Sequence, residues 1–324
     1  MKNVLITGGT GFLGSHIVKN LLEEEEVENI VIVSTTIRHY TSLRYLDIAS
    51  EKISPVKGDV RDYVFLQNLF NEYEFDTVIH LGALSEVRKC QSNPKLAYDV
   101  NIGGTTNLLE VIRLYGNVKA IVVSSSDKAY GECDLPYKET DPLAGKAVYE
   151  VSKSCQDLVA QSFYHNYKLP IVVTRCSNLY GAGDANFSRI IPNTVRRILD
   201  GESPVIWSGS EKSTREFLHV EDAARAYLEL IRNIEKTKGN AYNIGSGQKT
   251  TMLDLVEKII ENIDPAIKIK YEKKEFPEIS HQYLDSSKIK KDTGWQATID
   301  IDSGLQKTIK EYKQIFAERK KADV

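Results

Sequence analysis

The stretch TGGTGFLG, residues 7–14, decides the fold of this chain. It follows the apolar run NVLIT and precedes SHIVKNLLEEE, in which apolar residues recur at helical spacing. Glycines between a strand and a helix allow a tight turn, and they let a pyrophosphate approach the backbone N–H groups at the helix N-terminus. The stretch therefore predicts a dinucleotide site, with a purely structural turn as the alternative. Two glycine frames fit, and they use Gly8, Gly9, Gly11 and Gly14.

The alternation of strand and helix continues as far as Arg175. Short apolar runs, among them NIVIV, TVIHLG, KAIVVSSS and PIVVTRC, are separated by segments with helical spacing. Such a pattern indicates a parallel sheet covered on both faces, the doubly wound α/β (Rossmann) class. Beyond Arg175 the pattern loosens, and we expect a smaller, interleaved C-terminal domain for the substrate. The expected limits are 1–176 for the dinucleotide-binding domain, with 217–247 returning to it, and 177–216 with 248–324 for the smaller domain.

The composition gives no sign of a nucleic-acid-binding, membrane-spanning, secreted or metal-binding protein. Among 324 residues, 42 basic and 45 acidic side chains give a net charge of −3, so nothing favours nucleic acid or acidic membranes as partners. No apolar run suggests a secretory signal or a membrane span, and we expect a soluble, cytoplasmic protein. The four scattered cysteines form no CxxC pair and have no histidine at zinc spacing, so no metal site is expected.

The segment after the second strand bears on the cofactor. An NAD site usually has an acidic residue there, whereas IVIVSTTIRH offers Ser34, Thr35, Thr36 and Arg38. Hydroxyls and a guanidinium suit the 2′-phosphate of NADP, so NADP is favoured and NAD is possible. Further on, Asp59 in GDVRD is either an acceptor for the adenine amino group or the cap of a following helix.

Two motifs carry the chemistry. Ser126, Asp127 and Lys128 follow the strand AIVVS, at the sheet edge where parallel sheets bind ligands. Tyr149 and Lys153 stand four residues apart in VYEVSKS and would share a helix face. We expect the Lys153 ammonium to lower the pKa of Tyr149 and make the phenol a usable base. The alternatives are a helix-surface pair for Tyr149 and Lys153, and an exposed ion pair for Asp127 and Lys128.

The chain resembles the extended short-chain dehydrogenase/reductases that act on nucleotide sugars. The resemblance covers nearly the whole chain and lies in TGGTGFLG, HLGALSEV, NIGGTTNLLE, SSSDKAYG, YEVSK, RCSNLYGAGD and REFLHVEDAARA. It implies that Ser126, Tyr149 and Lys153 form a catalytic triad that oxidises C4 of the sugar. Asp127 and Lys128 fall on the acid and base of hexose 4,6-dehydratases, most of which have Glu at the second place. The segments LSEVRKCQSNP and GAGDANFSRIIPN are similar to those of the CDP-glucose 4,6-dehydratases, which also have Asp-Lys at these positions.

The same resemblance implies ligand contacts and an assembly. Cofactor contacts fall on Gly8, Gly11, Phe12, Leu13, Gly14, Thr36, Arg38, Asp59, Val60, Leu81, Gly82, Ala83, Tyr149 and Lys153. Substrate contacts fall on Ser85, Asn178 and Arg215. The family often has an arginine before the late Asp-x-Ser-Lys segment, but FPEISHQYLDSSK has none, so the contacts of the pyrophosphate and base differ there. A homodimer formed through two helices per subunit is also implied.

The resemblance implies a 4,6-dehydratase, a lyase with a tightly bound nicotinamide cofactor. Such an enzyme oxidises C4 of an NDP-hexose, eliminates water from C5 and C6, and returns the hydride to C6, which gives an NDP-4-keto-6-deoxyhexose. Tyr149 and Ser126 would serve the oxidation, and Lys128 and Asp127 the elimination. A nucleotide-sugar 4-epimerase, which needs no Asp-Lys pair, is the first alternative. An NADPH-dependent 4-keto-sugar reductase is the second, and a cofactor-binding sensor without chemistry is a third.

Overall fold

A seven-stranded parallel sheet forms the centre of the computed structural model, which describes residues 1–36, 42–273 and 280–322. The strands lie in the order β10-β6-β5-β4-β1-β2-β3. The fold class is therefore the expected doubly wound α/β class, and the order in which strands are added to the sheet reverses between β1 and β4. The strands are β1 (Asn3–Thr7), β2 (Asn29–Ser34), β3 (Ile53–Lys57), β4 (Thr77–His80), β5 (Ala120–Ser124), β6 (Ile171–Cys176) and β10 (Ala241–Ile244).

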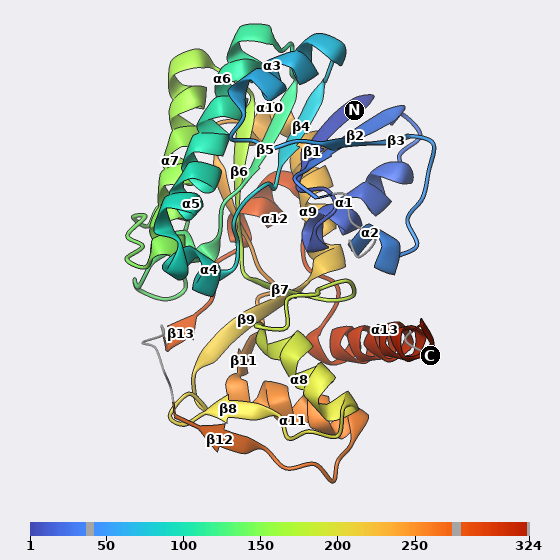
Figure 1. Cartoon of the computed structure of the whole chain (residues 1–324). Helices are drawn as coiled ribbons and strands as arrows, with labels where there is room; N and C mark the ends of the chain where they lie inside the picture. The colour runs from blue at the N-terminus through green and yellow to red at the C-terminus, as the bar shows by residue number, and fades with distance from the viewer. Residues whose placement is uncertain (37–41, 274–279, 323–324) are drawn as a thin grey trace.

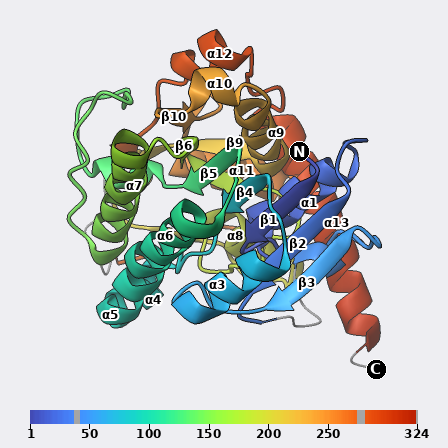
Figure 2. The same cartoon turned by 90° about the horizontal axis from the view of Figure 1, so that it is seen from above.

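Successive residues of the strands face opposite sides of the sheet, and both sides are apolar. In β1, Val4 and Ile6 pack on one face, while Leu5 packs on the other. The first face is covered by α1 (Phe12–Leu22) and α9 (Val220–Arg232). The second is covered by α3 (Tyr63–Glu72), α6 (Thr105–Tyr115) and α7 (Val148–Tyr167), and Figure 2 shows the two helix layers from above.

Some local features of the fold were not predicted from the sequence. β3 contains Pro55 and had not been expected as a strand, but it lies at the sheet edge, where proline is tolerated. The helical segment before β5 is not one continuous α-helix, because a π-helical turn at Asp99–Gly104 separates α5 from α6. The shorter helices are α2 (Ser42–Tyr45), α4 (Val87–Ser92), α5 (Pro94–Tyr98), α10 (Ile234–Thr237) and α12 (Ser287–Thr293).

A smaller group of elements lies below the large sheet in the view of Figure 1. Its strand β9 pairs with β7, β11 and β13, and β8 pairs separately with β12. Its helices pack around a second apolar core that includes Val195, Leu255 and Ile309. The elements are β7 (Asn178–Tyr180), α8 (Ile190–Leu199), β8 (Val205–Trp207), β9 (Thr214–His219), β11 (Lys249–Thr251), α11 (Met252–Ile263), β12 (Lys270–Glu272), β13 (His281–Gln282) and α13 (Ile301–Ala322).

The chain crosses between the two groups several times. After β9 it returns through α9 and β10, and β10 pairs in parallel with β6. One part of the range 248–324 differs from its expected assignment, because Ile289 and Trp295 pack into the core beneath the large sheet. Ile289 lies on α12, which packs against β10, and Trp295 Nε1 donates to the carbonyl of Asp222 on α9. The other domain limits remain a prediction. Among the described residues, no helix combines the length and apolarity needed to cross a membrane.

A buried ion pair joins α7 to β6 and gives a stability prediction. Arg175 Nε donates to Asp157 Oδ2 over 2.8 Å, and both side chains are almost fully buried. Replacing Arg175 with Met would leave a buried carboxylate without its cation, so we expect a loss of about 3–5 kcal/mol in the free energy of unfolding. Urea denaturation measures this. Lys95→Met, which breaks an exposed pair with Asp99, is the control and should cost at most ~1 kcal/mol; equal effects would contradict the prediction.

Candidate active site

The glycine turn lies where the strand order of the large sheet reverses. It follows β1, and the loop after β4 lies against it, since a Cβ on Gly8 would come within 3.1 Å of Gly82 N. Gly8 has a φ of +73°, which favours glycine. The Thr7 hydroxyl ties the two loops together, because it accepts from Gly82 N over 3.0 Å and hydrogen-bonds with His80 Nδ1 over 2.7 Å. The crevice at such a reversal is the usual ligand site of an open α/β sheet.

The turn fits the pyrophosphate of a dinucleotide. A Cβ on Gly14 would lie 2.5 Å from Gly8 O, so the helix and the turn are in close contact. Helix α1 starts after Gly11, and within the described chain no side chain caps it. Its first N–H groups are therefore available to an anion, and the helix dipole favours negative charge there.

The residues after β2 only partly match the expected ribose site. Ser34 and Thr35 line the cleft, but Thr36 does not. Thr36 is exposed, and its carbonyl accepts from the Ser34 hydroxyl over 3.1 Å. Arg38 lies outside the described residues. The sequence analysis missed Arg61, which lines the cleft and donates to the carboxylate of Asp59.

Asp59 does not cap a helix. The cap of α3 is Asp62, whose side chain accepts from Phe65 N over 2.9 Å, so the capping alternative for Asp59 is wrong. The Arg61 guanidinium beside Asp59 holds the pKa of that carboxyl below its ordinary value. Asp59 is therefore an ionised acceptor at the edge of the cleft.

A cleft of about 2320 Å³ runs between the large sheet and the smaller group of elements. Both groups contribute to its lining. All of the expected site residues line this cleft, except Thr36 and Arg38, which lies outside the described residues. The expected residues that line it are Gly8, Gly11, Phe12, Leu13, Gly14, Asp59, Val60, Leu81, Gly82, Ala83, Ser85, Ser126, Asp127, Lys128, Tyr149, Lys153, Asn178 and Arg215.

Ser126, Asp127 and Lys128 lie at the carboxyl end of β5. The Ser126 hydroxyl donates to Asp127 Oδ1 over 3.1 Å and accepts from Lys128 N over 3.2 Å, which starts a short 3₁₀ turn. Asp127 is only 3% exposed, and its burial raises the pKa of the carboxyl, against the opposing effect of Lys128. The alternative of a solvent-exposed ion pair therefore does not fit. Lys128 is half-buried and donates to Gln282 Oε1.

Tyr149 and Lys153 line the cleft from α7, but one expectation about them is wrong. Burial raises the pKa of the Tyr149 phenol to about 12, and the opposing hydrogen bond comes from Ser126. Lys153 does not lower this pKa as expected, because its amine is held elsewhere. Lys153 Nζ donates to the Ser124 carbonyl over 2.8 Å and to Gln156 Oε1 over 2.7 Å.

Burial also lowers the pKa of Lys153, from 10.5 to about 8. The folded protein then releases this proton at a lower pH than the unfolded chain, so stability rises with pH between about 8 and 10.5. We expect the wild type to gain about 2 kcal/mol relative to Lys153→Met between about pH 7.5 and about pH 9.5. Urea unfolding of both proteins at the two pH values measures this; parallel changes in the two proteins would contradict it.

The substrate side of the cleft is lined by β7, β9 and α8. Asn178 Nδ2 donates to the Glu216 carbonyl over 3.1 Å, and the buried Arg215 donates to the carbonyls of Thr214 and Ser280. Sequence reasoning missed Arg189, which lines the cleft, pairs with Asp184 over 3.0 Å and acts on the pKa of Tyr149. It lies just before α8, and only its basic character could have drawn attention to it.

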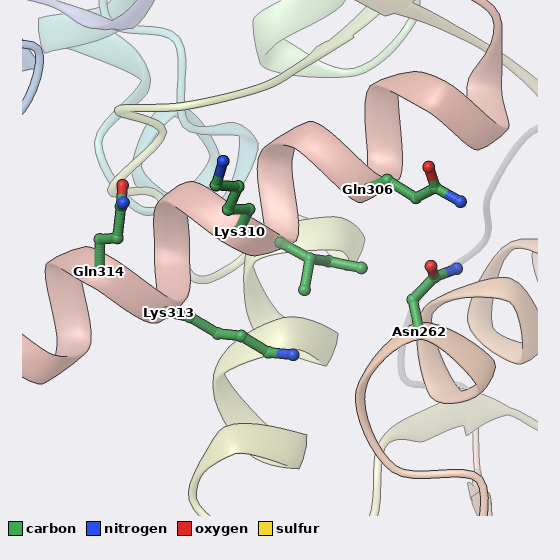
Figure 3. A pocket seen from close by; sticks show the side chains of 6 residues that line it. Asn262, Gln306, Lys310, Lys313 and Gln314 are labelled. Carbon is green, nitrogen blue, oxygen red and sulfur yellow. The ribbon is translucent and has the colours of Figure 1, made fainter.

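A second pocket, of about 430 Å³, lies between α11 and α13 (Figure 3). It contains none of the expected site residues. Its lining is Asn262, Gln306, Ile309, Lys310, Lys313 and Gln314, so it offers no carboxylate, histidine, thiol or hydroxyl side chain.

Comparison with known proteins agrees with the fold and the motifs. The model of the GDP-mannose 4,6 dehydratase family matches residues 5–308. A dTDP-glucose 4,6-dehydratase of Neisseria gonorrhoeae is 31% identical over 337 residues, which cover 96% of this chain and 95% of that protein. The chain therefore belongs to the extended short-chain dehydrogenase/reductases, in the nucleotide-sugar dehydratase and epimerase family.

Solved structures of both kinds of enzyme are similar to this one. A dTDP-glucose 4,6-dehydratase from Bacillus anthracis in complex with NAD has a TM-score of 0.84 at 27% identity, with 97% of both chains covered. A UDP-glucose 4-epimerase from Thermotoga maritima with UDP-glucose has a TM-score of 0.89 at 25% identity, covering 97% of this chain and 99% of that one. These similarities support an enzyme that acts on a nucleotide sugar, and they include both a dehydratase and an epimerase.

Proposed function

We propose that this protein is a nucleotide-sugar 4,6-dehydratase, which converts an NDP-hexose to an NDP-4-keto-6-deoxyhexose. One observation carries the proposal: the buried acid Asp127 and the amine Lys128 follow Ser126 in the cleft that Tyr149 also lines. C4 oxidation alone needs neither group. Elimination of water needs both an acid and a base, because a proton leaves C5 and the 6-hydroxyl must be protonated as it departs.

Tyr149 and Ser126 serve the oxidation of C4. In its phenolate form Tyr149 removes the proton of the 4-hydroxyl and becomes a phenol, and the hydroxyl of Ser126 donates to the oxygen as its charge develops. The hydrogen bond with Ser126 already opposes the rise in the pKa of Tyr149 that burial causes. Oxidation of C4 makes the C5 proton acidic enough to be removed.

Lys128 and Asp127 then serve the elimination. A neutral Lys128 takes the C5 proton, the electrons of that bond form the C5–C6 double bond, and the C6–O bond breaks. Asp127, whose raised pKa keeps it protonated to a higher pH, donates its proton to the departing oxygen, which leaves as water. Lys128 afterwards returns its proton to C5. Tyr149 then releases to solvent the proton that it took from the 4-hydroxyl, and Asp127 takes up one proton from solvent, so both side chains return to their starting forms.

The cofactor is a nicotinamide dinucleotide held by the glycine turn, the loop after β4, Asp59 and Lys153. A nicotinamide bound there would supply the hydride chemistry of the reaction, from C4 of the sugar and back to C6, with no net consumption of cofactor. We infer NADP rather than NAD, because the described residues at the end of β2 that line the cleft are the hydroxyl residues Ser34 and Thr35. Fluorescence titration with NADPH and NADH tests this, and tighter binding of NADH would contradict it.

Arg215, Asn178 and Ser85 are proposed to bind the substrate, with the Arg215 guanidinium on the diphosphate. Phe187, Ile191 and Val205 line the same cleft and give an apolar surface for the base. The finer similarity to the CDP-glucose enzymes makes CDP-glucose the first substrate to try.

We also propose a homodimer formed through α6 and α7. These adjacent helices expose large apolar side chains, which a second copy would cover: Leu114, Tyr115, Leu158 and Tyr167. Analytical ultracentrifugation should show a dimer, and Leu158→Glu should shift it to monomer. A monomeric wild type would contradict this assembly.

The reaction itself is tested by mass spectrometry of a panel of NDP-hexoses incubated with the protein and trace NAD or NADP. Loss of one water from one sugar, without net reduction of the cofactor, is expected. The similarity to the Thermotoga maritima enzyme makes a 4-epimerase the second candidate. An unchanged mass with an inverted C4 in the NMR spectrum would favour it, and consumption of NADPH would identify a reductase.

A further inference from the structure

A glutamine of the smaller sheet contacts both members of the Asp127–Lys128 pair. Gln282 is fully buried on β13. Its Oε1 accepts a hydrogen bond from Lys128 Nζ, and its Nε2 donates to the backbone carbonyl of Asp127 over 3.3 Å. Gln282 does not line the cleft, so it would act on the reaction only through these neighbours.

The same strand is paired with the segment proposed to bind the diphosphate. In the parallel pairing of β13 with β9, Gln282 lies opposite Arg215. Arg215 Nη1 also donates to the carbonyl of Ser280, two residues before Gln282, over 3.1 Å. One short pair of strands in the smaller sheet therefore holds both Arg215, which is proposed to bind the diphosphate, and Gln282, which contacts Lys128.

We propose that Gln282 is a positioning residue for the elimination step, which orients the Lys128 amine toward the C5 hydrogen. This inference rests on the dehydratase function proposed above. A neutral amine has two N–H donors and one lone pair, and an amide oxygen that accepts one N–H restricts where the lone pair points. Because the amide carries no charge, it favours the ammonium form, which cannot act as a base, less than a carboxylate at the same position would.

The role is specific to one half of the reaction. Lys128 takes the C5 proton and becomes an ammonium, the C5–C6 double bond forms, and O6 leaves as water with the proton of Asp127. Gln282 contacts neither Tyr149 nor Ser126 through any hydrogen bond seen among the described residues. Loss of its contact should therefore slow the elimination and leave the oxidation of C4 in place.

The test uses two substitutions of Gln282 in the full-length protein. Gln282→Glu places a carboxylate beside Lys128, which favours the ammonium, so the rising limb of the pH–rate profile for water loss should move up by about one pH unit or more. Gln282→Met removes the acceptor at similar size and should lower the rate of water loss about tenfold or more. Gln248→Met is the control, because the exposed Gln248 side chain accepts from Ile301 N and does not line the cleft.

The readouts separate a positioning role from damage to the fold. Water loss is followed by mass spectrometry, and the 4-ketohexose that keeps its 6-hydroxyl is trapped with borodeuteride. In Gln282→Met this ketohexose should accumulate, whereas a misfolded protein would form neither product. If wild type loses water and both variants keep its rate and pH profile, the inference is overturned and the dehydratase stands. If the wild type removes water from no sugar, the dehydratase function and the role of Gln282 are both contradicted.

Discussion

Replacing Tyr149 with Phe should lower the rate of sugar turnover by about 10²- to 10⁴-fold. The substitution removes only the phenol oxygen, which is the proposed acceptor of the 4-hydroxyl proton, and the ring still fills its place on α7. Binding of the cofactor and the free energy of unfolding should change little. The measurement is kcat by mass spectrometry of the product, together with NADPH binding by fluorescence.

The matched control is Tyr167→Phe, at the exposed end of the same helix. It removes an identical atom outside the cleft, and we expect wild-type turnover. If Tyr149→Phe kept a tenth or more of the wild-type rate with the same pH dependence, the phenol would not be the base for C4 oxidation.

Replacing Lys128 with Met should reduce water loss by about 10²- to 10⁴-fold while the oxidation of C4 persists. The amine is the proposed base for the C5 proton, and Tyr149 and Ser126 remain in place. A 4-ketohexose with its 6-hydroxyl intact should therefore form, and borodeuteride trapping followed by mass spectrometry detects it. Asp127→Asn should also slow the water loss, because an amide cannot donate the proton that the departing oxygen needs.

Lys138→Met, which changes an exposed lysine beyond the 3₁₀ turn, serves as the control and should leave both steps unchanged. Full water loss in both Lys128→Met and Asp127→Asn would remove the basis for assigning a dehydratase. Loss of C4 oxidation along with elimination would instead give Lys128 a role in substrate binding.

The fold was predictable from the sequence because its signals are local. The glycine turn, the apolar strands and the amphipathic helices follow directly along the chain, and their periodicity fixes a doubly wound sheet. The Ser126, Asp127 and Lys128 cluster was also visible, since a strand end is where such a sheet exposes polar groups to a ligand. Most expected cofactor residues line the cleft for the same reason.

What the sequence missed depends on side-chain contacts that spacing along the chain does not reveal. The spacing of Tyr149 and Lys153 does not reveal that Ser124 and Gln156 hold the lysine amine, so the expected lowering of the tyrosine pKa is wrong. The contact between Lys128 and Gln282 joins residues 154 positions apart. Thr36 has the right chemistry for a ribose site, but it is exposed and does not line the cleft.

The most direct test of the dehydratase function follows a deuterium placed at C4 of the NDP-hexose. The account predicts that the label moves within the same molecule to the new C6 methyl group as one water is lost, and NMR of the product would show it there. A label that stays at C4 with that carbon inverted and the 6-hydroxyl retained would contradict the account, and the protein would then be an epimerase.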